Sequence, residues 1–98
     1  MTGKTKKLTQ QEIKTRLSNL DNWVLVQDRI EKQLQFKSFE SAINFVNQVA
    51  EIAKQKDHHP DMTINYNKVT LALKNHKSKT LTRMDFDVAQ EIDKLFHK

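Results

Sequence analysis

Three of the four histidines in this 98-residue chain lie in two short segments that could act together. His58 and His59 are adjacent and precede Pro60, His76 follows further along the chain, and His97 is the fourth. An unperturbed imidazole has a pKa of about 6.5, so it can take up or release a proton near neutral pH. Two or three imidazoles that converge on one site could therefore supply a general acid and a general base together. We assign no role to His97.

The segment between His59 and His76 alternates apolar and polar residues, which is the pattern of β-strands. Residues 62–66 and 69–73 form two such runs. Asn67-Lys68 between them predicts a two-residue hairpin loop, because asparagine tolerates positive φ. Extending the ladder from this loop puts His59 opposite His76, and directly opposed residues have Cβ atoms roughly 4.5–5.5 Å apart. The sequence therefore predicts two imidazoles at the open end of one hairpin.

Other interpretations of these histidines stay open from spacing alone. Pro60 has no N–H to donate and can end the ladder before it reaches His59, and the direction of the His58 side chain is undetermined. A structural interpretation makes the histidine pair part of a polar loop and His76 a surface strand residue, and spacing by itself favours it. A zinc site of three histidines ranks lower, because adjacent histidines rarely converge on one ion and no carboxylate-rich second shell is evident.

Three segments have the periodicity of helices. A capping-box pattern precedes a first helix over about residues 10–19. Ser38 can cap a second helix, which is expected to end before the polar run at residues 54–57. A last helix is expected to start at Thr82. On the second helix, apolar residues recur every three or four positions and predict a buried stripe: Phe39, Ala42, Ile43, Val46, Val49, Ala50 and Ala53.

Strands are predicted over residues 23–26 and 30–36, in addition to the two strands of the hairpin. The order of elements is then helix, strand, strand, helix, strand, strand, helix. This order predicts an α+β fold, with a four-stranded antiparallel sheet, three helices on one face of it and the other face open. No repeat or linker divides the chain, so we expect residues 8–98 to form one domain and residues 1–7 to be a flexible N-terminus.

Composition excludes several kinds of site. The chain has no cysteine, which removes disulfides, thiolate nucleophiles and cysteine-based zinc sites. No apolar run approaches the roughly 20 residues of a membrane span, and we expect a cytoplasmic protein. The net charge of +5 keeps nucleic acid in consideration, but the lysines are spread along the chain without interleaved aromatic residues. We therefore expect a solvated basic surface rather than a nucleic-acid interface.

The motif formed by residues 57–60 (DHHP), residues 66–69 (YNKV), His76 and Asp85 resembles the signature of the pterin-4a-carbinolamine dehydratases. That family is also known as the dimerisation cofactor of a homeodomain transcription factor. The resemblance implies the αββαββα fold and the dehydration of a 4a-hydroxytetrahydropterin to a quinonoid dihydropterin, in tetrahydrobiopterin recycling. It also implies no metal or cofactor, and a functional link to an aromatic amino-acid hydroxylase.

The resemblance further implies roles for individual residues. His58, His59 and His76 match the active-site histidines, and our hypothesis is that His58 and His76 exchange the protons while His59 orients the pterin. Asp57 matches a substrate-site position. Asp85 matches the last residue of the signature and is expected to orient His76, although it also stands where the capping acid of the last helix belongs.

The remaining matches are weaker. Trp23 matches an aromatic residue near the pterin pocket of the family, but a lone tryptophan in a strand is more often a core residue.

The chain departs from its relatives at three places. Many relatives carry glutamate at the position of Lys54, several carry an aromatic residue at the position of Met62, and small hydroxyl residues replace residues 74–75. These departures affect the expected rate and preferred pterin more than the reaction type.

The same resemblance supports a second function class, a non-catalytic interaction or assembly protein. The complete histidine set favours catalysis, because assembly-type relatives typically lose it. We also expect a homodimer or homotetramer, because the core of so short a chain is small. The apolar stripe of the second helix and the free edges of the sheet are the surfaces available for self-association.

Overall fold

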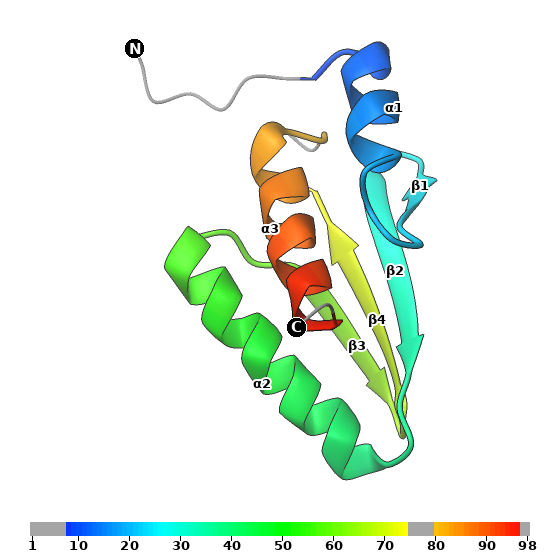
Figure 1. Cartoon of the computed structure of the whole chain (residues 1–98), viewed down its shortest axis with the longest axis vertical. Coiled ribbons are helices and arrows are strands. Elements are labelled where there is room, and N and C mark those ends of the chain that lie inside the picture. Colours follow the sequence, from blue (N-terminus) through cyan, green and yellow to red (C-terminus); the bar gives the residue numbers. More distant parts are fainter. Residues whose placement is uncertain (1–7, 75–79, 97–98) are drawn as a thin grey trace.

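The computed structural model describes residues 8–74 and 80–96. The predictions for residues 1–7 and for His76 fall outside this part of the chain. The elements in order are α1 (Gln10–Leu17), β1 (Val24–Val26), β2 (Arg29–Gln35), α2 (Phe39–Lys56), β3 (Asp61–Asn65), β4 (Lys68–Leu73), α3 (Arg83–Asp93) and a 3-10 turn (Lys94–Phe96) (Figure 1). The predicted α+β fold and its element order are confirmed.

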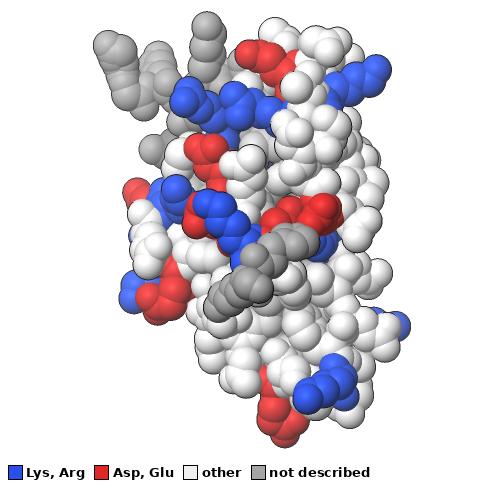
Figure 2. Space-filling view, in the orientation of Figure 1, with Lys and Arg blue, Asp and Glu red and all other residues white. Residues whose placement is uncertain are grey.

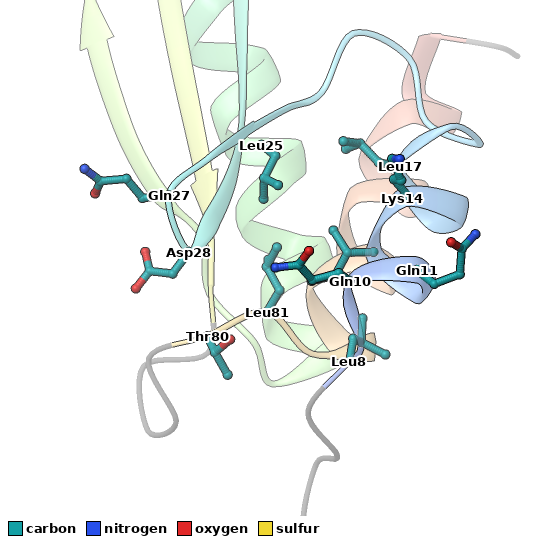
Figure 3. Close-up of a pocket in the computed structure, with 11 residues that line it drawn as sticks. Leu8, Gln10, Gln11, Lys14, Leu17, Leu25, Gln27, Asp28, Thr80 and Leu81 are labelled. Atoms are coloured by element: carbon teal, nitrogen blue, oxygen red, sulfur yellow. The ribbon is translucent and has the colours of Figure 1, made fainter.

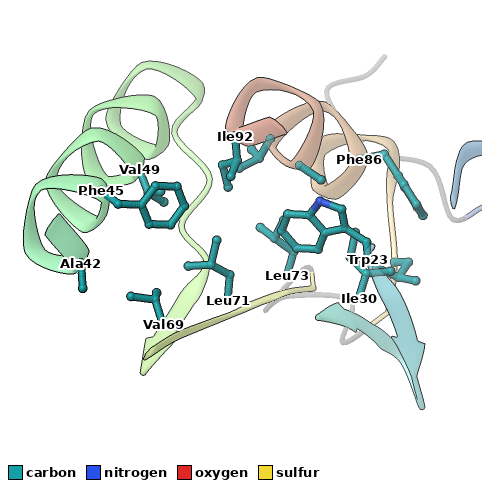
Figure 4. Close-up of a cluster of buried hydrophobic side chains, with 13 residues drawn as sticks. Trp23, Ile30, Ala42, Phe45, Val49, Val69, Leu71, Leu73, Phe86 and Ile92 are labelled. Carbon is teal, nitrogen blue, oxygen red and sulfur yellow. The ribbon is translucent and has the colours of Figure 1, made fainter. Parts of the chain in front are cut away.

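The sheet is antiparallel throughout, with strand order β1-β2-β4-β3. α2 and α3 lie side by side on one face of it (Figure 1). Alternate residues of the two central strands point to these helices and join side chains of α2 and α3 in the buried cluster of Figure 4. The strand residues that are completely buried there are Ile30, Val69, Leu71 and Leu73. Burial of this apolar surface is the main force that holds the two helices on the sheet.

α2 buries Ala42, Val49 and Ala53 of the predicted stripe, and also Phe45, which was not predicted. Ser38 caps the helix as expected, since its side chain accepts a hydrogen bond from the backbone of Ser41. The buried residues are Ala42, Phe45, Val49 and Ala53, whereas Phe39 remains 44% exposed. The helix also continues through the polar run, so the predicted end before residue 54 was wrong. It ends at Asp57, whose φ of 52° is left-handed, and Pro60 follows shortly after.

The β3–β4 hairpin turns one residue earlier than predicted. Asn65 pairs with Lys68, so the loop is Tyr66-Asn67, and the positive φ of 56° falls on Tyr66. The backbone and side chain of Asn67 are held by Phe36, which donates to its carbonyl at 2.8 Å and accepts from its amide at 2.7 Å. The faces of both strands are unchanged by this shift. The described ladder begins at Asp61, opposite Ala72, and does not reach His59. The predicted pairing of His59 with His76 lies outside the described residues.

A buried charged cluster, which was not predicted from the sequence, joins β2 to the end of α3. Lys32 lies directly opposite Leu71 on the helix-covered face, and its ammonium is 2.9 Å from Oδ1 of Asp93. Asp93 also accepts hydrogen bonds from the indole N–H of Trp23 at 2.9 Å and from the backbone N–H of Asp21 at 3.0 Å. The cluster therefore ties the segment before β1 to the core.

Candidate functional site

His58 is placed by the way α2 ends. Asp57 adopts the left-handed conformation, and the backbone N–H of His58 donates to the carbonyl of Ala53 at 3.1 Å. These two features define a Schellman-type end, which turns the chain sharply away from the helix axis. The turn directs His58 toward the start of α3. His58, an early residue of the sequence motif, thereby contacts Asp85, the last residue of the motif.

His58 meets Asp85 in a short contact. Nε2 of His58 lies 2.5 Å from Oδ1 of Asp85, and the side chains are 11% and 0% exposed. Oδ2 of Asp85 accepts the backbone N–H of Thr82 at 2.9 Å, which is the capping-box contact at the start of α3. The capping role predicted for Asp85 is confirmed. Its expected partner His76 lies outside the described residues, and the imidazole it holds within them is His58.

This arrangement suits His58 to proton transfer. An ionised carboxylate only accepts hydrogen bonds, so Asp85 holds the Nε2–H of His58. The other ring nitrogen, Nδ1, is then the atom that can take up or release a proton. A buried carboxylate also keeps the ring in one orientation. The pair can therefore act as a general acid or base whose reactive nitrogen is defined by the fold.

The other predicted site residues divide between two regions. Asp57 and His59 flank His58 in the loop between α2 and β3, and both are exposed to solvent. Trp23 is 5% exposed and sits in the core against Asp93, two turns of α3 away from Asp85. The core alternative for Trp23 is confirmed, and its predicted role toward the pterin stays a prediction. The structure thus brings together His58 and Asp85, with Asp57 and His59 beside them.

Lys54, which stands where many relatives carry glutamate, does not bring its positive charge next to the His58–Asp85 pair. The Lys54 side chain is 72% exposed, and its ammonium lies 3.8 Å from the carboxylate of Glu51. It therefore points its charge into solvent beside an acid of its own helix. An exposed pair of this kind contributes little to stability.

The described residues offer no group of three or more potential metal ligands among histidine, aspartate and glutamate. Within the same ranges, no helix is long and apolar enough to cross a membrane. Basic and acidic side chains alternate over the face of the molecule in Figure 2. On that face neither sign of charge forms a continuous stripe, and the absence of a nucleic-acid interface stays a prediction.

A hollow of about 640 Å³ lies away from the His58–Asp85 pair, between α1 and the β1–β2 hairpin. Its walls combine aliphatic and polar side chains, and Leu25 and Leu81 point toward each other across it (Figure 3). None of the predicted site residues lines it. The hollow is therefore separate from the candidate site at His58 and Asp85.

Comparisons with known proteins agree on one family. The family profile described as "Pterin 4 alpha carbinolamine dehydratase" matches residues 6–95. A relative from Picosynechococcus sp. is 45% identical over 91% of this chain and 97% of its own length. One from Acidobacterium capsulatum is 47% identical over 90% of this chain and 96% of its own. Both carry the provisional name pterin-4-alpha-carbinolamine dehydratase.

Two solved structures share the fold. A transcriptional coactivator/pterin dehydratase from Brucella melitensis superposes with a TM-score of 0.87 at 32% identity, over 92% of this chain and 98% of that one. A pterin dehydratase-like protein, identified as a RuBisCO assembly factor in the alpha-carboxysome, gives a TM-score of 0.64 at 17% identity, over 76% of this chain and 89% of its own. The second likeness bears on the fold alone.

Proposed function

Because this chain belongs to the pterin-4a-carbinolamine dehydratase family, we propose that it removes water from a 4a-hydroxytetrahydropterin by histidine acid–base catalysis. The observation that carries this proposal is the His58–Asp85 pair, in which a buried carboxylate holds one imidazole nitrogen and leaves the other for proton transfer. The product is a quinonoid dihydropterin. We place the reaction in the recycling of a tetrahydropterin, downstream of an aromatic amino-acid hydroxylase.

The reaction needs two proton movements and no change of oxidation state. A base removes the proton from the ring nitrogen next to C4a, and that electron pair forms the C=N bond as the C4a–O bond breaks. An acid gives a proton to the departing hydroxyl, which leaves as water. We assign these two steps to His58 and His76, with His59 and Asp57 orienting the pterin. General acid–base groups of this kind contribute about 10²–10⁴-fold to a rate.

The wild-type protein is expected to accelerate the dehydration of enzymatically generated 4a-hydroxytetrahydropterin, followed by ultraviolet absorbance. The rate should be the same after dialysis against a chelator, because the proposed chemistry uses imidazoles and no metal. A rate equal to that in buffer would end the proposal and favour the alternative, a non-catalytic assembly protein of the same fold. A rate lost on chelation and restored by one metal would instead replace the histidine mechanism.

We also propose that the protein is a homo-oligomer. Phe39 is 44% exposed at the start of α2, and the partly buried Ile43, Val46 and Ala50 extend its apolar line along the helix. The strands β1 and β3 form the two edges of the sheet. Exposed edges and a second apolar stripe on one helix are surfaces that a second copy can cover.

Light scattering at micromolar concentration is expected to give the mass of a dimer or tetramer. A Phe39→Lys variant should shift the mass toward the monomer, because it places a charge on the apolar line. Glu40→Lys, one position along on the exposed side of the same turn, is the matched control and should leave the mass unchanged. A monomer for the wild type would refute the proposal.

A further inference from the structure

Thr82 is a completely buried polar residue that the histidine motif does not include. Two donors of this residue point to one atom, since both its backbone N–H (2.9 Å) and its hydroxyl (3.3 Å) lie within reach of Oδ2 of Asp85. The two oxygens of Asp85 therefore have different partners. Oδ2 is fixed by Thr82, and Oδ1 faces His58.

A carboxylate on a short side chain can rotate about its last bond with little resistance, because that torsion has a broad distribution. Anchoring one oxygen removes this freedom and aims the other. We propose that Thr82 is a positioning residue for the acid–base chemistry, acting through Asp85 to orient the His58 ring and to set the charge that its Nε2–H meets. The activity part of this assignment rests on the proposed dehydratase function.

A helix cap alone does not require this arrangement, as α1 of the same chain demonstrates. Thr9 and Glu12 form a capping box there, with the Thr9 N–H donating to the carboxylate at 2.8 Å and the Thr9 hydroxyl accepting from the Glu12 backbone at 3.1 Å. Both residues are exposed. At Thr82 the pair is buried, the hydroxyl is within donating distance of the carboxylate, and an imidazole occupies the second oxygen. Thr9 is thus a matched control for capping without positioning.

The test compares Thr82→Val, Thr82→Ser and Thr9→Val. Valine removes the hydroxyl donor and keeps the shape, so kcat should fall about three- to tenfold with KM unchanged, since a donor to a charged group acts here only through Asp85. Serine restores the donor and should restore kcat. Thr9→Val should keep the wild-type kcat. Circular dichroism verifies that each variant is folded.

Rescue by serine separates positioning from a general effect of the substitution. Serine returns the hydroxyl donor to Oδ2 of Asp85, whereas valine keeps only the shape of the side chain. A serine variant as slow as the valine variant, or a valine variant with the wild-type kcat, would overturn the assignment.

A second readout does not depend on turnover. Nitrogen NMR of the His58 ring reports which ring nitrogen carries the proton. The wild type and Thr82→Ser should show the Nε2–H form, and Thr82→Val should show a mixture of the two neutral forms, because the carboxylate is no longer aimed at Nε2. If the wild type lacks dehydratase activity but this difference occurs, the proposed function fails and the positioning role stands. Identical spectra for all three proteins refute the role of Thr82 whether or not the protein is an enzyme.

Discussion

A His58→Ala variant is expected to lose about 10²–10⁴-fold of its dehydration rate, the contribution of a positioned general acid or base. The loss should appear in kcat, because the imidazole acts on protons that move in the transition state. Of the two histidines in the described part of the chain, His58 is the one that a buried carboxylate holds, with both side chains nearly closed to solvent. Stopped-flow absorbance with enzymatically generated substrate measures the effect.

His97→Ala supplies the matched control for this experiment, because it removes an imidazole that lies outside the motif. It should keep the wild-type rate. Adding His76→Ala to His58→Ala should bring the rate to that of buffer. The fold-loss of the double variant should be smaller than the product of the two single fold-losses, because the effects of groups that act as one unit are not additive. A His58→Ala protein that is folded and retains more than half of the wild-type kcat would remove His58 from the chemistry.

Lys32→Met is expected to destabilise the protein by about 3–5 kcal/mol, because it leaves a buried carboxylate without its cation. Methionine keeps an aliphatic chain of similar length and removes only the ammonium. The Lys32 and Asp93 side chains are 7% and 10% exposed, so solvent does little to replace the lost charge. The ammonium also lies over the rings of Trp23 (5.9 Å) and Phe96 (5.4 Å), and these cation–π contacts would be lost as well. Urea unfolding followed by circular dichroism measures the change in free energy of unfolding.

The matched control for Lys32 lies one residue beyond Asp93. Lys94 pairs with Glu91 at 2.8 Å, but its side chain is 71% exposed, so Lys94→Met should cost less than about 1 kcal/mol. Adding Asp93→Asn to Lys32→Met should recover part of the loss, because it neutralises the uncompensated carboxylate while keeping an acceptor for Trp23. Equal effects of Lys32→Met and Lys94→Met would mean that the buried pair contributes no more than a surface pair.

Much of the fold could be predicted from periodicity, because alternation and helical spacing record which face of each element is buried. The position of the hairpin loop could not. Asn67 was assigned to the loop for its tolerance of positive φ, yet that conformation falls on Tyr66, while the Asn67 side chain is used in a contact with Phe36. Because this contact joins residues that are far apart in the sequence, no local sequence pattern indicates it. A one-residue error in the loop then shifted the partners predicted along the ladder.

The candidate site, like the fold, could be predicted from the sequence only in part. The motif supplied His58 and Asp85 as separate members, but their contact depends on the left-handed end of α2, which periodicity does not reveal. The pair of Lys32 and Asp93 was missed although a signal existed. Lys32 shares its face with the buried Ile30, and Asp93 belongs to the apolar side of α3. One charge on the inner face of a strand and an opposite charge on the inner side of a helix indicate a buried ion pair.

Trp23 is the only tryptophan of the chain, and its indole N–H is bonded to Asp93 in the core. Its fluorescence is therefore an intrinsic probe of one defined place, where the segment before β1 meets α3. Unfolding exposes the ring to water and should shift its emission to longer wavelength. The indole lies two turns of α3 away from Asp85. Its fluorescence can therefore report whether variants of His58 or Asp85 are folded, because these substitutions do not contact the indole.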